Sequence, residues 1–292
     1  MSSEPNMASR FRPSTTATLS ELNGTAEPGW VRDFVRQKAR KRRRARVEVW
    51  FERVIGVCVV LAVWQALSSF NIVRPILISS PYLVGKDIGG WFVQATLWTD
   101  LRTTLTEMLI GLVFGTVVGV VLGIVVGVRP RLTKAVQPLV IAVHSVPVVV
   151  LVPLFLLWFG FGLFPKVLVV SLSVFFVMFF NTLTGTGEVN RLLISSMTIM
   201  GCGTLVVIRQ VYIPSVVTWV IIAMRSAIAY ALVGAVVSEF VAANSGLGYE
   251  MNNAALFLNV PRVFSVLIVL TVLGALLSGI VDIAERRLLR WR

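Results

Sequence analysis

NRLLISSMTIMGCGTLVVIRQVYIP, residues 190–214, is a short and moderately polar segment between two long apolar runs. The apolar runs cover residues 166–183 before it and 215–240 after it. Inside the segment, Gly201 is followed thirteen residues later by Pro214. A polar stretch between two runs of membrane-spanning length is expected to connect two spans outside the bilayer.

The overall composition is typical of a membrane protein. Of the 292 residues, 56% are hydrophobic and only 14% are charged, whereas soluble domains carry about 25% charged residues. The mean hydropathy is +0.84. Six apolar runs reach the length of about 20 residues that a spanning helix needs. They cover about 54–73, 106–128, 135–158, 166–184, 215–240 and 263–284. We therefore expect an all-α integral membrane protein with about six transmembrane helices rather than a soluble helical core.

The chain has 27 Lys and Arg residues against 14 Asp and Glu residues, which gives a net charge of +13. The basic residues are unevenly placed along the chain. Many lie in residues 1–53, above all in RQKARKRRRAR at 36–46, and others lie in the loops around 129–134 and 191–209 and in the tail from 286. The positive-inside rule then places both termini in the cytoplasm. We interpret residues 1–50 as a disordered basic tail that binds the anionic inner leaflet. A nucleic-acid-binding role is the alternative, but no fold that would read bases follows the run.

Several kinds of active site are absent from the sequence. The two cysteines, Cys58 and Cys202, do not form a disulfide framework, and His144 is the single histidine. Neither a Walker A loop nor an HExxH motif occurs. We expect no metal site, no cofactor and no ATP hydrolysis in this chain, and therefore no enzyme activity of its own.

The 190–214 stretch resembles the cytoplasmic coupling loop of ABC importer permeases. That loop has the pattern E-A-A, three residues, G, nine residues, I-x-L-P. The residues that fit it are Gly201, Val211, Ile213 and Pro214. Ser195, Ser196 and Met197 stand where E-A-A is usual, so the acidic residue is missing.

Two further stretches resemble one subfamily, the nitrate/sulfonate/taurine-type permeases. Residues 138–166, PLVIAVHSVPVVVLVPLFLLWFGFGLFPK, follow that subfamily's R-x-x-P-x-x-A-x-x-P-L…W-F-G-x-G…K, with His144 where the arginine is usual. Residues 223–240, AMRSAIAYALVGAVVSEF, follow G-L-R-x-A-x-G-x-A…V-x-x-E, and the subfamily's G-L-G comes next at 246–248. The resemblance covers about residues 54–292.

The resemblance implies the type I importer fold and a transport subunit in the bacterial inner membrane. Two permeases, identical or not, would form the path for a small anionic or vitamin-precursor solute. ATPase subunits would bind ATP and Mg, and an external binding protein would deliver the solute. The alternative is an ATP-independent secondary carrier or another polytopic membrane protein. A carrier is expected to show internal repeats or several intramembrane acids, and we find neither.

In the resembling family the coupling loop forms a short helix that sits in a cleft of the ATPase. The residues here that would contact the ATPase or shape the loop are Ser195, Ser196, Met197, Met200, Gly201, Leu205 and Pro214. Gly201 would provide a tight bend, and Pro214 would begin the fifth span at its first turn.

Ionisable residues inside spans are costly and usually face protein or a water-filled cavity. Arg225 lies about 16 Å beyond Pro214 at 1.5 Å per residue. Glu239 follows fourteen residues later, close to a whole number of turns, so the two share a face. With His144 they are candidates for the translocation path. The alternative is that each is packed or tied to a neighbouring span.

Two other features bear on packing. Residues 76–100 are expected to lie along the outer membrane surface, with Trp91 and Trp98 at the interface. A glycine recurs at every fourth position from Gly111 to Gly127, which predicts close approach of another helix, either as static packing or as a sliding contact.

Overall fold

The structure is a computed structural model that describes residues 52, 55–56, 58–70 and 78–288. The chain divides into two units, Met1–Val63 and Trp64–Arg292. The expected basic tail, 1–50, lies outside the described residues. The expected first span, 54–73, is described in part and contains an apolar helix, Cys58–Ser69.

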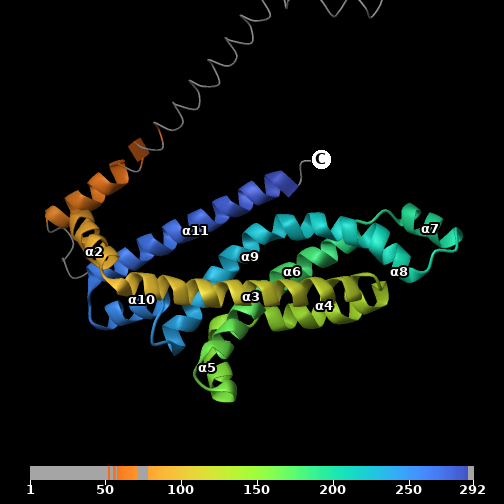
Figure 1. The fold of residues 1–292 in the computed structure, drawn as a ribbon, viewed down its shortest axis with the longest axis horizontal. Helices are drawn as coiled ribbons and strands as arrows, with labels where there is room; N and C mark the ends of the chain where they lie inside the picture. The colour runs from red at the N-terminus through yellow and green to blue at the C-terminus, as the bar shows by residue number, and fades with distance from the viewer. Residues whose placement is uncertain (1–51, 53–54, 57, 71–77, 289–292) are drawn as a thin grey trace, which may run out of the picture. The chain divides into compact units, whose positions relative to one another are not determined.

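The described part of the second unit is built from helices, with no strand (Figure 1). In chain order they are α2 (Pro81–Val93), α3 (Ala95–Gly127), α4 (Pro130–His144), α5 (Val148–Phe159), α6 (Leu163–Gly187), α7 (Arg191–Ile199), α8 (Thr204–Val207), the π-helix η3 (Ile208–Tyr212), α9 (Ile213–Ala242), α10 (Leu247–Leu256) and α11 (Val260–Leu288). The all-α prediction is confirmed.

Four helical stretches in the described residues are long and apolar enough to cross a membrane: Ala95–Gly127, Leu163–Gly187, Thr204–Ala242 and Val260–Glu285. The bent pair α4 and α5 makes a fifth if it is one span. The count of six stays a prediction. The helix that holds the predicted span 106–128 begins earlier, at Ala95, and therefore takes in the end of the segment that was expected to lie along the membrane.

The third expected span, 135–158, is not one straight helix. The axes of α4 and α5 meet at 88° across the break after His144. Pro147 lies at this break and is the residue before α5. Proline lacks an N–H and disfavours helical geometry in the residue before it. Pro153 lies inside α5 without ending it.

The closest helix contact joins α3 to α6. The five glycines at every fourth position of α3 face residues of α6 that are also four apart. A Cβ atom added at Gly119 would lie 2.8 Å from Met178 Cβ and 2.9 Å from the carbonyl oxygen of Phe175. The prediction of close approach is confirmed, and the partner is a helix of the same chain.

A buried apolar cluster extends this contact to α9. Its members include Met108 and Leu112 of α3, Val170 and Val174 of α6, and Ala227 of α9. Inside a bilayer, lipid tails are as apolar as these side chains, so the helices associate through tight packing and not through exclusion of water. The three helices α3, α6 and α9 therefore form the scaffold that carries the other elements.

Gly119→Ala should destabilise the folded chain by about 1–3 kcal/mol, the usual cost of overpacking a tight contact. Gly279→Ala in α11 is the matched control, because a Cβ there meets nothing within 4 Å. Thermal melting of the purified chain in detergent should show a lower midpoint for Gly119→Ala alone. Equal midpoints for the two variants would contradict the close approach of α3 to α6.

Candidate functional site

The segment between α6 and α9 forms a compact helical turn. α7 begins after Asn190, whose side chain accepts a hydrogen bond from the Leu192 amide at 2.9 Å. Such a cap satisfies one of the free amides at the start of a helix. α7 ends at Ile199, and α8 begins again at Thr204, so only four residues between them lack helical structure.

The end of α7 is a Schellman motif built on Gly201. The Cys202 amide donates to the carbonyl of Met197, and the Gly201 amide donates to the carbonyl of Thr198, both at 3.0 Å. Gly201 has φ +77°, the left-handed conformation that this cap requires. The expected tight bend at Gly201 is therefore present. A glycine is favoured at this position because other residues rarely adopt the left-handed conformation.

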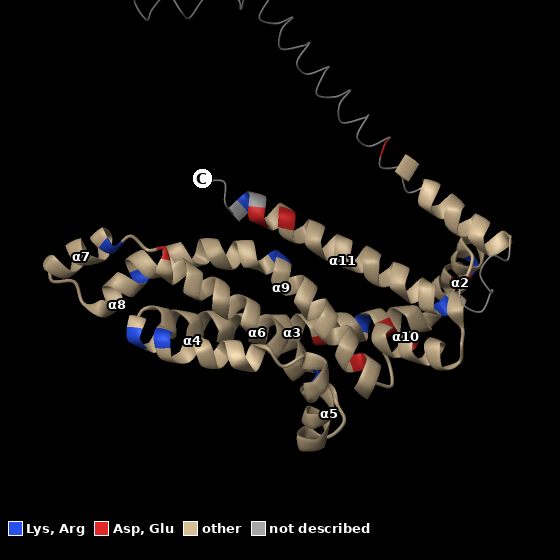
Figure 2. Ribbon diagram, turned by 180° about the vertical axis from the view of Figure 1, so that it is seen from behind, with Lys and Arg blue, Asp and Glu red and all other residues tan. Residues whose placement is uncertain are grey.

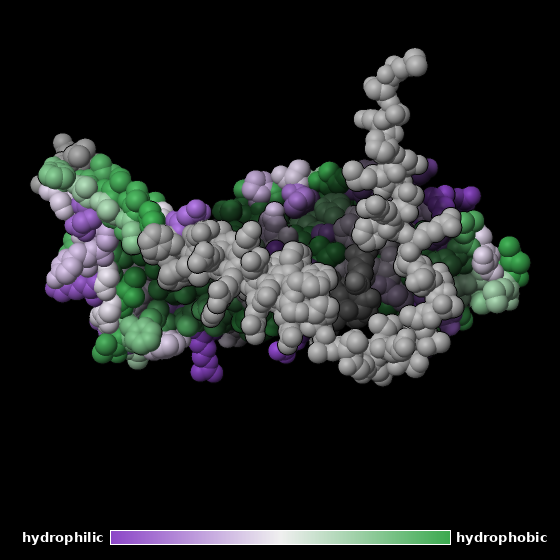
Figure 3. Space-filling view, turned by 90° about the horizontal axis from the view of Figure 1, so that it is seen from above, coloured by the Kyte–Doolittle hydropathy of each residue, from purple (hydrophilic) through white to green (hydrophobic). Residues whose placement is uncertain are grey.

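The residues expected to contact an ATPase are mostly exposed on this segment. Met200 is 79% exposed and Leu205 is 78% exposed, and Ile199 beside them reaches 87%. Ser195 and Ser196 are also exposed, whereas Met197 is half-buried. Figure 3 shows apolar surface at the end formed by α7 and α8, beside hydrophilic residues. These side chains have no apolar contacts that would bury them within the described chain.

Pro214 lies in the first turn of α9, which begins at Ile213, as expected. The helical backbone is nevertheless continuous from Thr204 to Ala242. Directly before α9, Ile208–Tyr212 form a π-helical turn. Proline removes a backbone donor, and an inserted π turn is one way in which a helix accommodates such a gap. The bounds 190–214 of the coupling loop stay a prediction.

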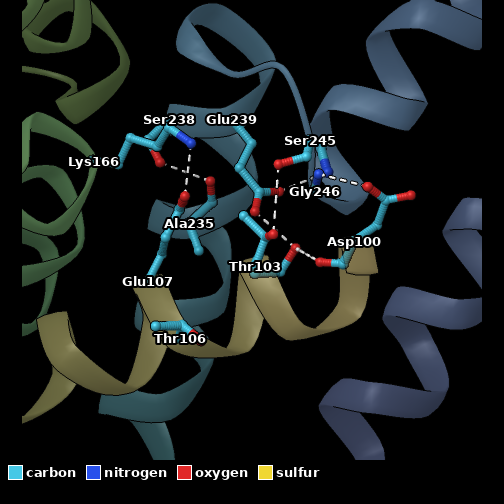
Figure 4. A network of polar contacts seen from close by, with 12 residues as sticks. Asp100, Thr103, Thr106, Glu107, Lys166, Ala235, Ser238, Glu239, Ser245 and Gly246 are labelled. Carbon is cyan, nitrogen blue, oxygen red and sulfur yellow. Dashed lines mark hydrogen bonds and ion pairs between the residues drawn. The ribbon is translucent and has the colours of Figure 1, made fainter. Parts of the chain in front are cut away.

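Glu239 lies at the other end of α9, inside a buried polar network (Figure 4). Its carboxylate accepts hydrogen bonds from Thr104 Oγ1 at 2.7 Å and from the Gly248 amide at 2.8 Å. Thr104 Oγ1 in turn accepts from the Leu247 amide at 3.0 Å, and Asp100 accepts from the Gly246 amide at 2.9 Å. Side chains of α3 and α9 thus cap the amino end of α10, where the free amides favour anions.

The two glycines of the 246–248 triplet are required by this arrangement. Gly246 has φ +118°, and a Cβ on it would collide with the Glu239 carboxylate. A Cβ on Gly248 would lie 2.9 Å from Glu239 Cβ and would also collide with the carbonyl of Val236. The backbone of α10 can approach Glu239 only because both side chains are absent.

A buried ion pair adjoins the network. Lys166 Nζ, in the first turns of α6, lies 2.7 Å from Glu107 Oε1 of α3. The side chains are 10% and 1% exposed. A buried charge without its partner is strongly destabilising, so this pair fixes the start of α6 against α3 (Figure 4).

Arg262 of α11 anchors the same end of the molecule. Its guanidinium lies 4.6 Å from the centre of the Trp91 ring, and its Nε lies 3.4 Å from Asp87 Oδ2. Trp91 is 1% exposed, so its ring packs inside the protein and not against lipid headgroups. Burial raises the pKa of Glu250 in α10, Asp100 raises it further, and Arg262 opposes both. These contacts join α2, α10 and α11.

The three path candidates are not brought together. Arg225 pairs with Asp282 of α11 and is more than half exposed. His144 is exposed at the end of α4 and packs on Phe176 with ring centroids 4.5 Å apart. Glu239 is 1% exposed. The geometry of Glu239 favours the structural role, and lining of the path stays a prediction for all three.

Comparison with known proteins decides the family. A sequence model of the family described as "Binding-protein-dependent transport system inner membrane component" matches residues 115–290. The chain belongs to this family. It is an ABC transporter permease of the nitrate/sulfonate/taurine type, as the resemblance predicted.

Several curated permeases align with most of this permease. The riboflavin transport system permease RibX of Chloroflexus aurantiacus is 35% identical and is covered to 88%, with 81% of this chain aligned. The formylaminopyrimidine transport permease ThiX of Halalkalibacterium halodurans is 32% identical, with 82% of this chain and 96% of ThiX aligned. The aliphatic sulfonates permease SsuC of Escherichia coli is 32% identical over 84% of this chain and 92% of its own.

Solved structures agree with the fold. A chain of the methionine ABC transporter MetNI in an inward-facing conformation matches with a TM-score of 0.57 and 20% identity. The match covers 68% of this permease and 95% of that chain. At this identity the likeness concerns the fold alone, which is that of type I importer permeases.

The buried network includes residues that sequence reasoning did not connect. Lys166, Glu239 and the 246–248 triplet each belonged to a matched motif, but Asp100, Thr104 and Glu107 did not. Glu107 and Lys166 are separated by 59 positions. The available signal was an excess of acidic side chains beside an apolar run, together with a lysine at the start of another.

Lys166→Met should destabilise the permease by about 3–5 kcal/mol, because it leaves the Glu107 charge buried and unpaired. The double variant Lys166→Met/Glu107→Gln should regain at least half of that loss in thermal or denaturant unfolding of the purified protein. Lys86→Met, on the exposed face of α2, is the control and should have no effect. If the loss in the double variant equals the sum of the losses in Lys166→Met and in Glu107→Gln alone, the two groups do not interact.

Proposed function

We propose that this permease forms half of the translocation path of an ATP-driven importer. Its solute would be a small anion or a vitamin precursor that an external binding protein delivers. The observation that carries the proposal is the exposed apolar surface of α7 and α8. It belongs to a chain that has no nucleotide-binding motif of its own.

The shape of α7 suits a part that transmits force. Asn190 caps its start and the Schellman motif at Gly201 closes its end, so the segment is a rigid turn. Its apolar side chains would fill a cleft of an ATPase subunit. Movement of that cleft would reach α6 through Asn190 and reach α9 through the continuous helix that begins at Thr204. The missing acidic residue at Ser195 would alter the polar part of the contact.

The bent pair α4–α5 supports a path beside it. A broken helix is tolerated in a bilayer where protein or a water-filled cavity satisfies the freed backbone groups. The break after His144 would lie inside the bilayer if α4 and α5 form one span, and α5 carries exposed Trp158 and Phe159. We place the path along this break, between this permease and a second copy or a paralogue.

The substrate class rests on the relatives. Their names concern aliphatic sulfonates, formylaminopyrimidine, riboflavin and taurine, which are small polar solutes. Within the described residues, Arg225 and His144 are the exposed candidates that can contact an anion along α9 and α4. Neither residue identifies one particular solute.

Charge distribution supports a cytoplasmic position for α7. Figure 2 shows basic residues gathered where the start of α4 lies near α7 and α8. They are Arg129, Arg131, Lys134, Arg191 and Arg209, with Glu188 as an acidic neighbour. Such an excess marks the cytoplasmic side of an inner-membrane protein. It implies that both termini are cytoplasmic and that α2 and α10 are external.

Ile199→Glu should reduce ATP-driven uptake at least tenfold, because it places a charge in the centre of the proposed apolar contact. The chain itself should remain folded, since Ile199 is 87% exposed. The measurement is uptake and ATP hydrolysis by the reconstituted complex. Ile199→Leu keeps the apolar contact and should transport like the wild type. Wild-type uptake with Ile199→Glu would remove α7 as the transmission point.

Cysteine labelling tests the orientation. In a chain with Cys58 and Cys202 replaced by serine, Lys86→Cys on exposed α2 should react with an impermeant maleimide from outside intact cells. Arg209→Cys should react only after permeabilisation. External labelling of Arg209→Cys would contradict the proposed topology.

A further inference from the structure

A cavity of about 480 Å³ lies where α3, α4, α6 and α7 meet. The turn between α3 and α4 forms one wall, the end of α6 forms the floor, and α7 with Tyr212 closes the other side. The exposed apolar residues of the coupling contact, Ile199, Met200 and Leu205, do not line this cavity, and Ser195 is the one expected contact residue that does. Nothing in the proposed transport mechanism occupies this cavity.

The cavity is basic. Lys134 of α4 and Arg191 of α7 both line it, together with the hydroxyl residues Thr133 and Ser195. Among the described residues, neither Lys134 nor Arg191 has a carboxylate within ion-pairing distance. Glu188 is adjacent in sequence to lining residues but does not itself line the cavity. Two cationic side chains from different helices therefore converge on one polar space.

The first turn of α4 adds to this positive character. Pro130 begins α4, and no side chain caps its amino end. The start of a helix carries a partial positive charge that favours anions. Since Pro130 and Thr133 line the cavity, this helix end adjoins the same space as Lys134 and Arg191.

Apart from Thr186 and Tyr212, the remaining lining residues carry no polar side-chain group, and several lie at helix ends. Gly127 is the last residue of α3, and Gly187 is the last residue of α6. Leu183 lines the cavity and also belongs to the apolar cluster of Val126 and Phe179, which lies further along the same helices. The cavity is thus polar towards the end of the spans and apolar towards their centre.

We propose that this cavity binds the headgroup of an anionic phospholipid of the inner leaflet. The phosphate would lie between Lys134, Arg191 and the start of α4, and the glycerol and upper acyl chains would lie towards Leu183. Basic pockets between transmembrane helices on the cytoplasmic side are suited to such headgroups. A soluble phosphate offers similar anionic oxygens but has no apolar part to fill the apolar side of the cavity, so the lipid is the better match.

The position of the cavity gives the lipid a function. Arg191 and Ser195 belong to α7, whereas Lys134 belongs to α4. A bound headgroup would therefore hold the coupling helix against the scaffold. This role rests on the proposed cytoplasmic position of α7, but binding of the lipid to the cavity does not require that the importer mechanism be correct.

The test is thermal melting of the full chain, purified with the ATPase that accompanies it, in a neutral detergent. The probes are phosphatidylglycerol, phosphatidylcholine and inorganic phosphate. Phosphatidylglycerol should raise the melting temperature, and the other two should not. In Lys134→Gln/Arg191→Gln the half-saturating concentration of phosphatidylglycerol should rise about 30-fold, since each charge near an anionic headgroup contributes about fivefold. Arg131→Gln/Arg209→Gln removes the same charge at exposed positions outside the cavity and should respond like the wild type.

Four results would overturn the proposal. The first is a wild-type melting temperature that does not respond to phosphatidylglycerol. The second is an equal loss of response in both double variants, which would indicate diffuse surface charge. The third is full stabilisation by inorganic phosphate, which would indicate a soluble-anion site. The fourth is loss of the ATPase from Lys134→Gln/Arg191→Gln without any added lipid, which would assign these residues to a protein contact. Failure of uptake in Ile199→Glu, by contrast, leaves the lipid response unaffected.

Discussion

The backbone of α3 lies directly against α6, and the rest of the structure depends on this contact. In hydrocarbon, apolar side chains gain nothing by leaving lipid, so helices must associate through close packing and polar contacts. Glycines at every fourth position of α3 allow that approach along the length of both helices. α9 then packs on α6, and α10 and α11 follow from α9. This scaffold therefore fixes the positions of the elements at both ends of the spans.

Polar contacts complete what packing begins at the proposed external end. The Glu107–Lys166 pair joins α3 to the start of α6, and Glu239 joins α9 to the start of α10. Because such groups are expensive to leave unpaired away from water, the arrangement tolerates few alternatives. The opposite end has no comparable network among the described residues. It presents an exposed apolar turn and a basic cavity, which are features of a surface that meets partners and lipid.

The sequence predicted the features that arise from local rules. The glycine repeat predicted the close helix contact, Gly201 predicted the bend, and the long apolar runs predicted the helices. Errors arose where distant residues compensate for a local cost. The predicted span began near 106, after Asp100 and Arg102, yet the helix begins at Ala95, and Asp100 is buried and accepts a hydrogen bond from Gly246. Likewise, the polar residues Arg209 and Gln210 indicated a loop, whereas the helix is continuous from Thr204 to Ala242.

The candidate site shows the same division. The exposure of most coupling residues could be predicted from the polar loop in which they lie. The surroundings of the two charged residues in α9 could not, because they depend on contacts with other helices. Glu239 and Arg225 share a face in sequence but have different partners, α3 with α10 in one case and α11 in the other. Helical spacing gives direction around one axis, and it gives no information on which neighbour lies there.

The central claim is that the turn formed by α7 and α8 is where an ATPase subunit moves this permease. A photo-cross-linking residue at Met200, which is 79% exposed, tests it most directly in membranes that contain the assembled complex. The account predicts a cross-link to the ATPase whose yield changes when ATP is bound, and none from the same residue placed at Leu276 of α11. An ATPase cross-link from Leu276, or its absence at Met200, would contradict the account.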